Sequence, residues 1–215
     1  MIACAPTLPR AIRNGRPKRS SAPPLAGCSM TQAELLRYLV EVLESLSVDY
    51  MIGGSHAGIY YGEPRLTRDI DVIVDLPPDR IAPLLARFPA DDFYVDEAAA
   101  REAVTTRGQF NIIHPASAMK IDVYVSPDTA YDRERLRRRD RLPIVPGVDA
   151  YFVRPEDVIL YKLLYIQQVD SAMHARDVVG ILRVSGGELD ARYIAHWAEQ
   201  LGVRALWDRL RTQAE

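Results

Sequence analysis

The chain has 215 residues, of which 48% are apolar and 26% charged, with 27 lysines and arginines against 29 aspartates and glutamates. This composition excludes a wholly disordered chain and suits one domain, or a compact catalytic domain with a small helical appendage. The net charge of −2 excludes binding of nucleic acid through overall positive charge, so a phosphate-rich partner would need a local basic patch. No apolar run reaches the roughly 18 to 20 residues that span a bilayer. The two cysteines, Cys4 and Cys28, offer neither a disulfide scaffold nor a zinc site. We expect a cytoplasmic protein with no membrane partner.

Residues 1–30 are predicted to form a disordered basic tail. They hold five basic residues, five prolines and no acidic residue. An organelle leader has a similar composition, but the prolines disfavour the amphipathic helix of such leaders. The alternative is that the protein starts at Met30. Residues 31–215 contain 22 basic and 29 acidic residues, so their net charge is −7.

The spacing of apolar residues predicts an α+β fold of the α/β type, with a small mixed sheet flanked by helices over 31–142 and a mainly helical module over 143–215. Within 31–142 we expect a helix over 32–47, a strand over 50–53, a turn at 53–55 into a helix ending near 61, a strand over 69–75, a helix near 79–88, and strands near 109–114 and over 120–125. Within 143–215 a pair of short strands after Pro143 leads to Pro155, and helices are predicted over 156–168, 175–184, 191–201 and 204–212.

Carboxylates gather on one face of the strand predicted at 69–75. Because side chains alternate along a strand, Asp69, Asp71 and Asp75 share a face with Ile73, and the other face holds Ile70, Val72 and Val74. Asp122 has the same relation to its apolar neighbours in the strand at 120–125. We therefore expect Asp69, Asp71 and Asp122 to meet. The alternative for an isolated Asp-x-Asp pattern is a solvated strand edge.

Three clustered carboxylates repel one another unless a cation neutralises them, and oxygen ligands of this kind suit Mg²⁺ or Mn²⁺. Two such ions about 3.5 to 4 Å apart can activate an attacking hydroxyl and stabilise a leaving pyrophosphate. The three aspartates therefore favour metal-dependent phosphoryl or nucleotidyl transfer.

A glycine-rich turn precedes these aspartates. Gly53, Gly54 and Ser55 lie between a predicted strand and a predicted helix, where glycine allows close backbone approach and free N–H groups attract an anion. The serine hydroxyl can hold a phosphate oxygen. Such a turn alone is often only a turn, but its order before Asp-x-Asp predicts a phosphate-binding site.

This arrangement resembles the DNA polymerase beta-type nucleotidyltransferase superfamily, in which Gly-[Gly/Ser] precedes Asp-apolar-[Asp/Glu]-apolar. Here Gly54-Ser55 is followed by thirteen residues and then Asp69-Ile70-Asp71-Val72. The resemblance implies that Asp69 and Asp71 bind metal and that Asp122 completes the triad. It also implies that Gly53, Gly54 and Ser55 hold the phosphates of a nucleotide.

Within the superfamily, the chain looks like the AbiEii-type toxins of toxin–antitoxin pairs over roughly residues 35–185. The strings that carry this likeness are Gly53-Gly54-Ser55-His56-Ala57, Arg65-Leu-Thr67-Arg-Asp69, Glu156-Asp157-Val-Ile-Leu-Tyr-Lys162-Leu and Arg176-Asp177-Val-Val. His56 departs from the pattern, where an apolar or small residue is expected.

Lys162 lies inside the apolar arc of its predicted helix, where an ordinary surface lysine would not. It either extends out of the core or points into the cleft as a cation for the triphosphate. Asp177 either orients this cation or stabilises a helix start. Arg65 and Thr67 are candidate nucleotide contacts, with ordinary loop residues as the alternative.

Two further sets have open interpretations. The six arginines between 133 and 141, placed between a predicted helix and a predicted strand, are either an RNA-binding patch or a solvated face. We interpret His114, His174 and His196 as structural. Core packing is the expected role of four tyrosines on helical faces, with base stacking as the alternative; they are Tyr60, Tyr61, Tyr161 and Tyr165.

The sequence thus predicts a Mg²⁺-dependent enzyme that transfers a nucleoside monophosphate from an NTP to an acceptor hydroxyl. Asp122 would help deprotonate the acceptor, and Gly54, Ser55 and Lys162 would position the triphosphate. The likeness to AbiEii toxins implies RNA, such as a tRNA 3′ end, or a protein as acceptor, and an antitoxin partner. The alternatives are an aminoglycoside-type antibiotic nucleotidyltransferase and a nucleotide-binding module without turnover.

Overall fold

The computed structural model describes residues 29–64 and 66–214. The predicted tail at 1–28 and Arg65 therefore lie outside the described residues. The helices are α1 (Gln32–Ser45), α2 (Gly54–Tyr61), α3 (Pro78–Leu85), α4 (Glu97–Thr106), α5 (Ala130–Arg138), α6 (Pro155–Gln168), α7 (Ala172–Ser185), α8 (Ala191–Gln200) and α9 (Arg204–Ala214). The strands are β1 (Asp49–Ile52), β2 (Asp69–Asp75), β3 (Tyr94–Val95), β4 (Gln109–His114), β5 (Met119–Val125), β6 (Asp140–Val145) and β7 (Val148–Phe152).

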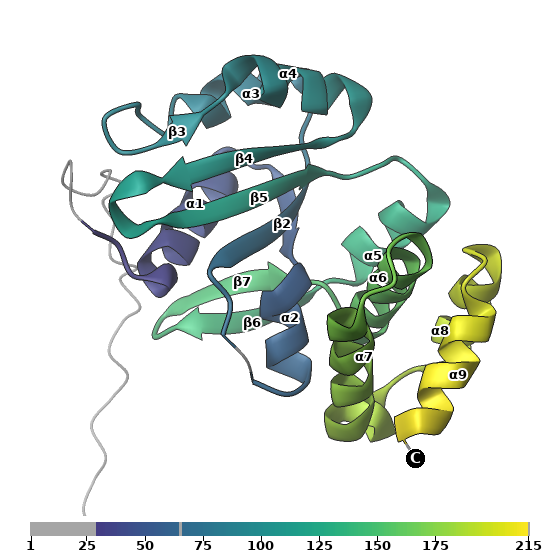
Figure 1. Ribbon diagram of the computed structural model, residues 1–215. Helices are drawn as coiled ribbons and strands as arrows, with labels where there is room; N and C mark the ends of the chain where they lie inside the picture. The colour runs from purple at the N-terminus through teal and green to yellow at the C-terminus, as the bar shows by residue number, and fades with distance from the viewer. Residues whose placement is uncertain (1–28, 65, 215) are drawn as a thin grey trace, which may run out of the picture.

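Over the described residues the strands form one mixed sheet in the order β3-β4-β5-β2-β1-β7-β6. The pairs β2–β5 and β1–β7 are parallel, and the other neighbours are antiparallel. Figure 1 shows α3 and α4 at the β3–β4 end and the cluster α6 to α9 beside the opposite half. The predicted mixed sheet with flanking helices and a helical C-terminal region is confirmed.

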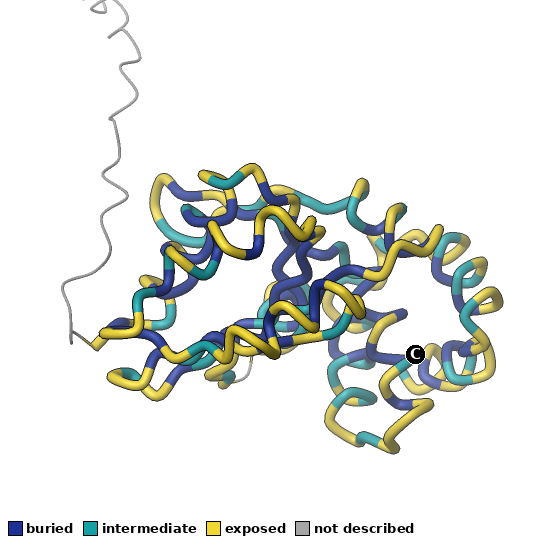
Figure 2. Tube along the Cα trace, turned by 90° about the horizontal axis from the view of Figure 1, so that it is seen from above, coloured by how far each residue is buried: buried dark blue, intermediate teal, exposed yellow. Residues whose placement is uncertain are grey.

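Apolar alternation builds the core around β2 and α1. The even-numbered residues Ile70, Val72 and Val74 are fully buried, so the odd-numbered residues face the other side of the sheet. A capping box formed by Thr31 and Glu34 begins α1, whose leucines pack into the core. In Figure 2 the buried trace follows the central strands and the exposed trace follows the outer helices. One sheet face is therefore left for polar residues.

Three elements lie where the sequence predicted none: β3, α4 and α5. Strand β3 has only two residues. Helix α4 is rich in alanine and buries only Ala100, Ala103 and Val104, so its apolar pattern is weak. Helix α5 is strongly charged, and it contains much of the arginine-rich stretch that we expected to follow a helix.

The chain passes from sheet to helices at Pro155. The predicted boundary at 142/143 lies within β6, which pairs with β7 on both sides of Pro143. Strand β7 in turn pairs with β1 at the centre of the sheet. We therefore propose that the catalytic core extends to residue 154 and that the helical module begins with α6. In the described residues, no helix is long and apolar enough to cross a membrane.

The six arginines between 133 and 141 all face carboxylates of the chain itself. The pairs are Arg133–Asp128, Arg135–Asp132, Arg137–Glu134, Arg138–Glu156, Arg139–Asp49 and Arg141–Glu44. Arg135 is buried, and its guanidinium lies 2.8 Å from Asp132. Arg139 reaches 2.7 Å to Asp49 at the start of β1. This segment ties α5 to the sheet and to α6, so it is not a free basic patch.

Asp157, in the first turn of α6, predicts a pH dependence of stability. The residue is fully buried, the Tyr193 hydroxyl donates to its Oδ1 at 2.8 Å, and burial raises the pKa of the carboxyl to about 6. The folded chain therefore binds this proton more tightly than the unfolded chain, and the resulting stability is lost as pH rises from about 4 through about 6. Asp157→Asn should remove this loss, because its amide is neutral at every pH.

The test is the free energy of unfolding in urea at pH 4.5 and pH 7.5. Relative to wild type, D157N should gain stability between these two values by about 2 kcal/mol. A difference between variant and wild type that does not change with pH would contradict the raised pKa.

Candidate active site

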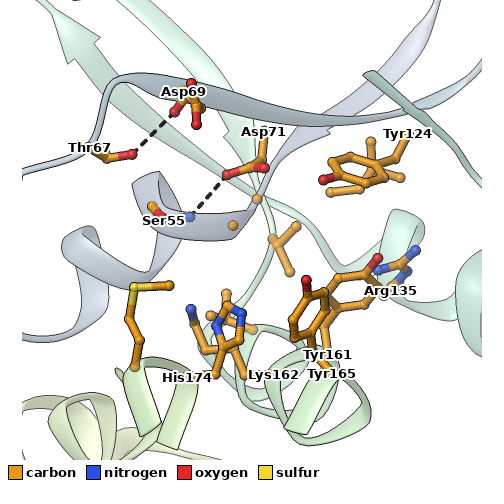
Figure 3. A pocket seen from close by; sticks show the side chains of 16 residues that line it. Ser55, Thr67, Asp69, Asp71, Tyr124, Arg135, Tyr161, Lys162, Tyr165 and His174 are labelled. Carbon is orange, nitrogen blue, oxygen red and sulfur yellow. Dashed lines mark hydrogen bonds between the residues drawn. The ribbon is translucent and has the colours of Figure 1, made fainter. Parts of the chain in front are cut away.

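A cleft of about 320 Å³ separates the polar face of the sheet from the C-terminal helices. In Figure 3, Ser55, Thr67, Asp69 and Asp71 lie on one side, and Lys162, His174, Tyr161 and Tyr165 lie on the other. The remaining lining residues are Gly53, Gly54, Ile73, Tyr124, Arg135, Val153, Val158 and Met173. The cleft therefore joins the predicted glycine-rich turn, two of the predicted aspartates and Lys162.

The parallel pairing of β2 with β5 brings the predicted carboxylates together. Asp71 is directly opposite Asp122, and Asp69 is directly opposite Lys120. Asp69 and Asp71 line the cleft, whereas Asp122 lies beside Asp71 on the neighbouring strand and is largely buried. Asp75 shares their face but lies at the far end of β2, where it pairs with Arg107 at 3.1 Å.

Lys120 is a site residue that the sequence interpretation missed. Its Nζ lies 2.9 Å from Asp122 Oδ2 and 4.0 Å from Asp69 Oδ2. The hydrogen bond to Asp122 raises the pKa of the ammonium, and the charges of Asp69 and Asp71 add to this effect. The acidic face therefore carries its own cation.

The glycine-rich turn packs directly against Asp71. Gly54 has φ +52°, and a Cβ on it would lie 1.9 Å from Asp71 Oδ2. The Ser55 N–H, at the start of α2, donates to this oxygen at 3.3 Å. A Cβ on Gly53 would lie 2.6 Å from the Ile73 side chain. Glycine is thus required at position 54, whereas at position 53 the end of the Ile73 side chain would have to shift. One amide of the predicted phosphate-binding turn holds the carboxylate of Asp71.

Burial raises the pKa of Asp71. The Ser55 N–H opposes this shift, while the charges of Asp122 and Asp69 add to it. Burial and the neighbouring negative charges destabilise the ionised carboxylate, and a cation nearby would stabilise it. Electrostatics at this position therefore agree with a site for positive charge.

Lys162 remains inside the protein. The residue is 4% exposed, and its Nζ donates to Asp177 Oδ2 at 2.7 Å. A Cβ on Gly58 of α2 would lie 3.7 Å from the same Nζ, so the ammonium lies against α2. The ion pair links α6 to α7 and places a fixed cation at the wall of the cleft.

Thr67 lines the cleft beside Asp69, and its hydroxyl donates to the Asp69 carbonyl at 3.4 Å. Its own carbonyl accepts from Gln32 Nε2 at 3.1 Å, which ties this loop to α1. Thr67 is therefore placed at the site predicted for it. Arg65, the other predicted nucleotide contact in this loop, lies outside the described residues.

The expectation of core packing is wrong for three of the four tyrosines, because Tyr60 is 48% exposed and Tyr161 and Tyr165 are exposed as well. Tyr161 and Tyr165 are 42% and 45% exposed and line the cleft on either side of Lys162 along α6. His174 also lines it, with its ring centroid 4.5 Å from that of Tyr165. The spacing of four residues puts both tyrosines on one helix face, but helical periodicity does not distinguish a face toward a core from a face toward a cleft.

The donor set is of the right chemical type for a divalent metal ion. Asp69, Asp71 and Asp122 supply carboxylate oxygens, which Mg²⁺ and Mn²⁺ prefer. Among residues 29–64 and 66–214, however, no three His, Cys, Asp or Glu side chains are grouped closely enough to hold one ion together. The residues therefore fit a metal in chemistry and in strand register, with Lys120 placed among them.

Removing the charge of Lys162 should destabilise the fold. Lys162→Met removes the Lys162 partner of the largely buried Asp177, which should lower the free energy of unfolding by up to about 3 kcal/mol. A double variant, Lys162→Met with Asp177→Leu, should regain some of this loss because both buried charges are gone. Urea unfolding of the three proteins measures both effects.

Measurements of NTP affinity then distinguish a nucleotide-binding role of Lys162 from a purely structural role. Calorimetry should find weak binding in the single and the double variant alike, because the cation is absent from both. Wild-type affinity in the stable double variant would show that Lys162 is only structural.

The sequence matches no protein-family model and no curated protein. Among solved structures, an antigenic nucleotidyltransferase-like protein from Paracoccidioides brasiliensis is similar, with a TM-score of 0.53 at 18% identity over 84% of this chain and 91% of that one. ANT(2″)-Ia in complex with adenylyl-2″-tobramycin has a TM-score of 0.54 at 16% identity over 86% of this chain and 100% of that one. The lincosamide antibiotic adenylyltransferase LnuA, bound to lincomycin, has a TM-score of 0.51 at 11% identity over 74% of this chain and 100% of that one. The chain therefore has the nucleotidyltransferase fold.

Proposed function

We propose that this protein is a Mg²⁺-dependent nucleotidyltransferase that moves a nucleoside monophosphate from an NTP to an acceptor hydroxyl. One observation carries the proposal: Asp71 accepts the Ser55 N–H at the start of α2 and lies in register with Asp122, across the cleft from Lys162. Asp69 and Asp71, which we propose as metal ligands, the start of α2 and the buried Lys162 all line one cavity of about 320 Å³, and this supports a nucleotide site.

Each residue has a role in this proposal. Asp69, Asp71 and Asp122 would hold Mg²⁺ or Mn²⁺, with two ions expected. The metal supplies charge neutralisation at the attacking and leaving oxygens. Lys162, oriented by Asp177, meets the negative charge of the triphosphate. The remaining nucleotide contacts are assigned to Gly53, Gly54, Ser55, Thr67 and Arg65.

The reaction is an in-line displacement. The acceptor oxygen forms a bond to the α-phosphorus, the bond from that phosphorus to the bridging oxygen of pyrophosphate breaks, and pyrophosphate leaves. Asp122 takes the proton of the acceptor hydroxyl. The cleft holds these groups in line and limits water near them.

For the acceptor, the motif likeness to AbiEii-type toxins supports RNA, such as a tRNA 3′ end, or a protein, together with an antitoxin partner. The buried Lys162–Asp177 pair supports the likeness itself, because it joins two of the resembling strings. Nucleotide-dependent modification of a cellular macromolecule is the first candidate activity.

Transfer to a hydroxyl of a small molecule is the second candidate. The arginines that would have formed an RNA patch are paired within the protein, which favours a compact acceptor. The cleft also presents exposed tyrosine rings, which suit the flat or sugar-like faces of a small molecule.

Transfer of label from α-³²P-labelled ATP, CTP, GTP and UTP in Mg²⁺ tests both candidates. The acceptors are total tRNA, the protein itself, a cell extract, and panels of aminoglycosides and lincosamides, with Asp69→Ala/Asp71→Ala as the inactive control. Label on RNA or protein supports the toxin-like activity, and label on a drug supports the second candidate. Nucleotide binding by calorimetry without transfer to any acceptor would instead indicate a binding module.

A further inference from the structure

Among the residues that the structure describes, Lys120 is the cation that forms salt bridges with Asp122 and Asp69, and nothing in the proposed reaction uses it. We propose that Lys120 is an internal counter-cation that competes with a divalent metal ion for the carboxylates of Asp122 and Asp69. It thereby sets the metal affinity of the site. This inference rests on the proposed function, because it takes these carboxylates as the metal ligands.

The position of Lys120 follows from strand register. Lys120 and Asp122 are two residues apart on β5, so they share the face that bears the site. Across the parallel pair β2–β5, Lys120 is opposite Asp69 and Asp122 is opposite Asp71. These four residues form a two-by-two patch of three acids and one base. A single lysine in that patch faces the predicted triad at close range.

The ammonium contacts oxygens that a metal ion would need. Lys120 Nζ is 2.9 Å from Asp122 Oδ2 and 4.0 Å from Asp69 Oδ2. Asp122 is 8% exposed, and a carboxylate this far from water needs a positive partner. A divalent ion on the same oxygens would repel the ammonium strongly at this distance. The two cations therefore compete for one set of carboxylates.

A metal ion could displace the ammonium group of Lys120 from its carboxylates, whereas the ammonium group of Lys162 is held in position. The Lys120 side chain is 36% exposed, so its four-carbon stem can turn its charge into water. The Lys162 side chain is 5% exposed and is held by Asp177 at 2.7 Å. The two lysines thus differ in kind: Lys162, in the wall of the cleft, is fixed, and Lys120, beside Asp122 and Asp69, is displaceable. Competition by a displaceable cation lowers metal affinity without abolishing the site.

The experiment measures Mn²⁺ binding to the full chain by the electron paramagnetic resonance signal of free Mn²⁺, after treatment with EDTA and without nucleotide. Lys120→Met removes the charge and keeps the length of the side chain, and Lys120→Arg keeps the charge. K120M should bind Mn²⁺ about tenfold more tightly than wild type, and K120R should stay within about twofold of wild type. Lys120→Gln is a second neutral variant whose amide can still donate to Asp122, and it should also bind more tightly.

Thermal unfolding supplies an independent readout. In EDTA, K120M should melt at a lower temperature than wild type, because Asp122 has lost its cation. Added Mn²⁺ should then raise the melting temperature of K120M by more than that of wild type. Adding Asp71→Asn to K120M should remove the extra Mn²⁺ affinity and so locate it at these carboxylates.

Unchanged or weaker Mn²⁺ binding in folded K120M and K120Q would overturn the proposal, as would a complete absence of Mn²⁺ binding in every variant. Tighter binding in both neutral variants supports it even where no nucleotide is transferred. In that case the role of Lys120 stands and the proposed nucleotidyltransferase activity fails, so the two outcomes are distinguishable.

Discussion

Replacing Asp71 by asparagine is expected to lower nucleotidyl transfer by about 1,000-fold while the chain stays folded. Asparagine has the shape of aspartate and can still accept the Ser55 N–H through its carbonyl oxygen. It removes the negative charge at the centre of the acidic face, between the start of α2 and Asp122. Since burial of the Asp71 carboxylate is unfavourable, the melting temperature of D71N should equal or exceed that of wild type. Labelled NTP turnover and thermal unfolding measure the two effects.

Asp75→Asn is the matched control for this variant. Asp75 lies on the same strand and the same face, its side chain is 53% exposed, and it pairs with Arg107 outside the cleft. The substitution removes the same charge four residues away, so transfer should stay within about twofold of wild type. Equal activity losses in D71N and D75N would point to general electrostatics, and full activity in D71N would remove Asp71 from the site.

Replacing Gly54 by alanine should damage both stability and transfer. At φ +52° any other L-residue costs about 1 to 3 kcal/mol. The added Cβ would also lie 1.9 Å from Asp71 Oδ2, so the carboxylate must move. We expect the free energy of unfolding to fall by about 2 to 3 kcal/mol. Transfer should fall by about 100-fold, because a displacement of about 1 Å at a reacting centre has that effect.

Gly58→Ala in the same helix is the control for the loss of a glycine. A Cβ there meets the Lys162 side chain at 3.5 Å, which is an ordinary contact. Alanine in a helix interior should raise stability, by up to about 1 kcal/mol. Urea unfolding of the two variants should therefore give shifts of opposite sign. Loss of stability of the same size in G54A and G58A would refute the argument from φ and the Asp71 contact.

Much of the fold was predictable because its elements have strong apolar periodicity. Strand β2 shows strict alternation, and α1 has a capping residue and a leucine face. The elements that sequence reasoning missed are weakly patterned: α4 buries mainly alanines, and α5 consists largely of charged residues held by ion pairs. Their helicity depends on partners elsewhere in the chain, which local sequence does not display.

The sequence predicted many of the residues of the candidate site, but it predicted fewer of the contacts between them. Alternation predicted that Asp71 and Asp122 face the same way, and it places Lys120 on that face as well. The register that sets Lys120 opposite Asp69 joins strands far apart in sequence, and no local pattern specifies it. Likewise, the role of Tyr161 and Tyr165 depends on what α6 faces across the cleft.

The pairing of the six arginines also affects how partners reach the cleft. A positive charge that is cancelled within a few ångströms acts on distant molecules only as a dipole, and salt at physiological strength screens it beyond about 8 Å. An approaching molecule therefore meets a net charge of −7 over residues 31–215, which the five basic residues of 1–30 reduce to −2 for the whole chain. Encounter with a polycationic acceptor is accelerated at low ionic strength, whereas a polyanion is slowed and must be retained by short-range contacts formed after it arrives.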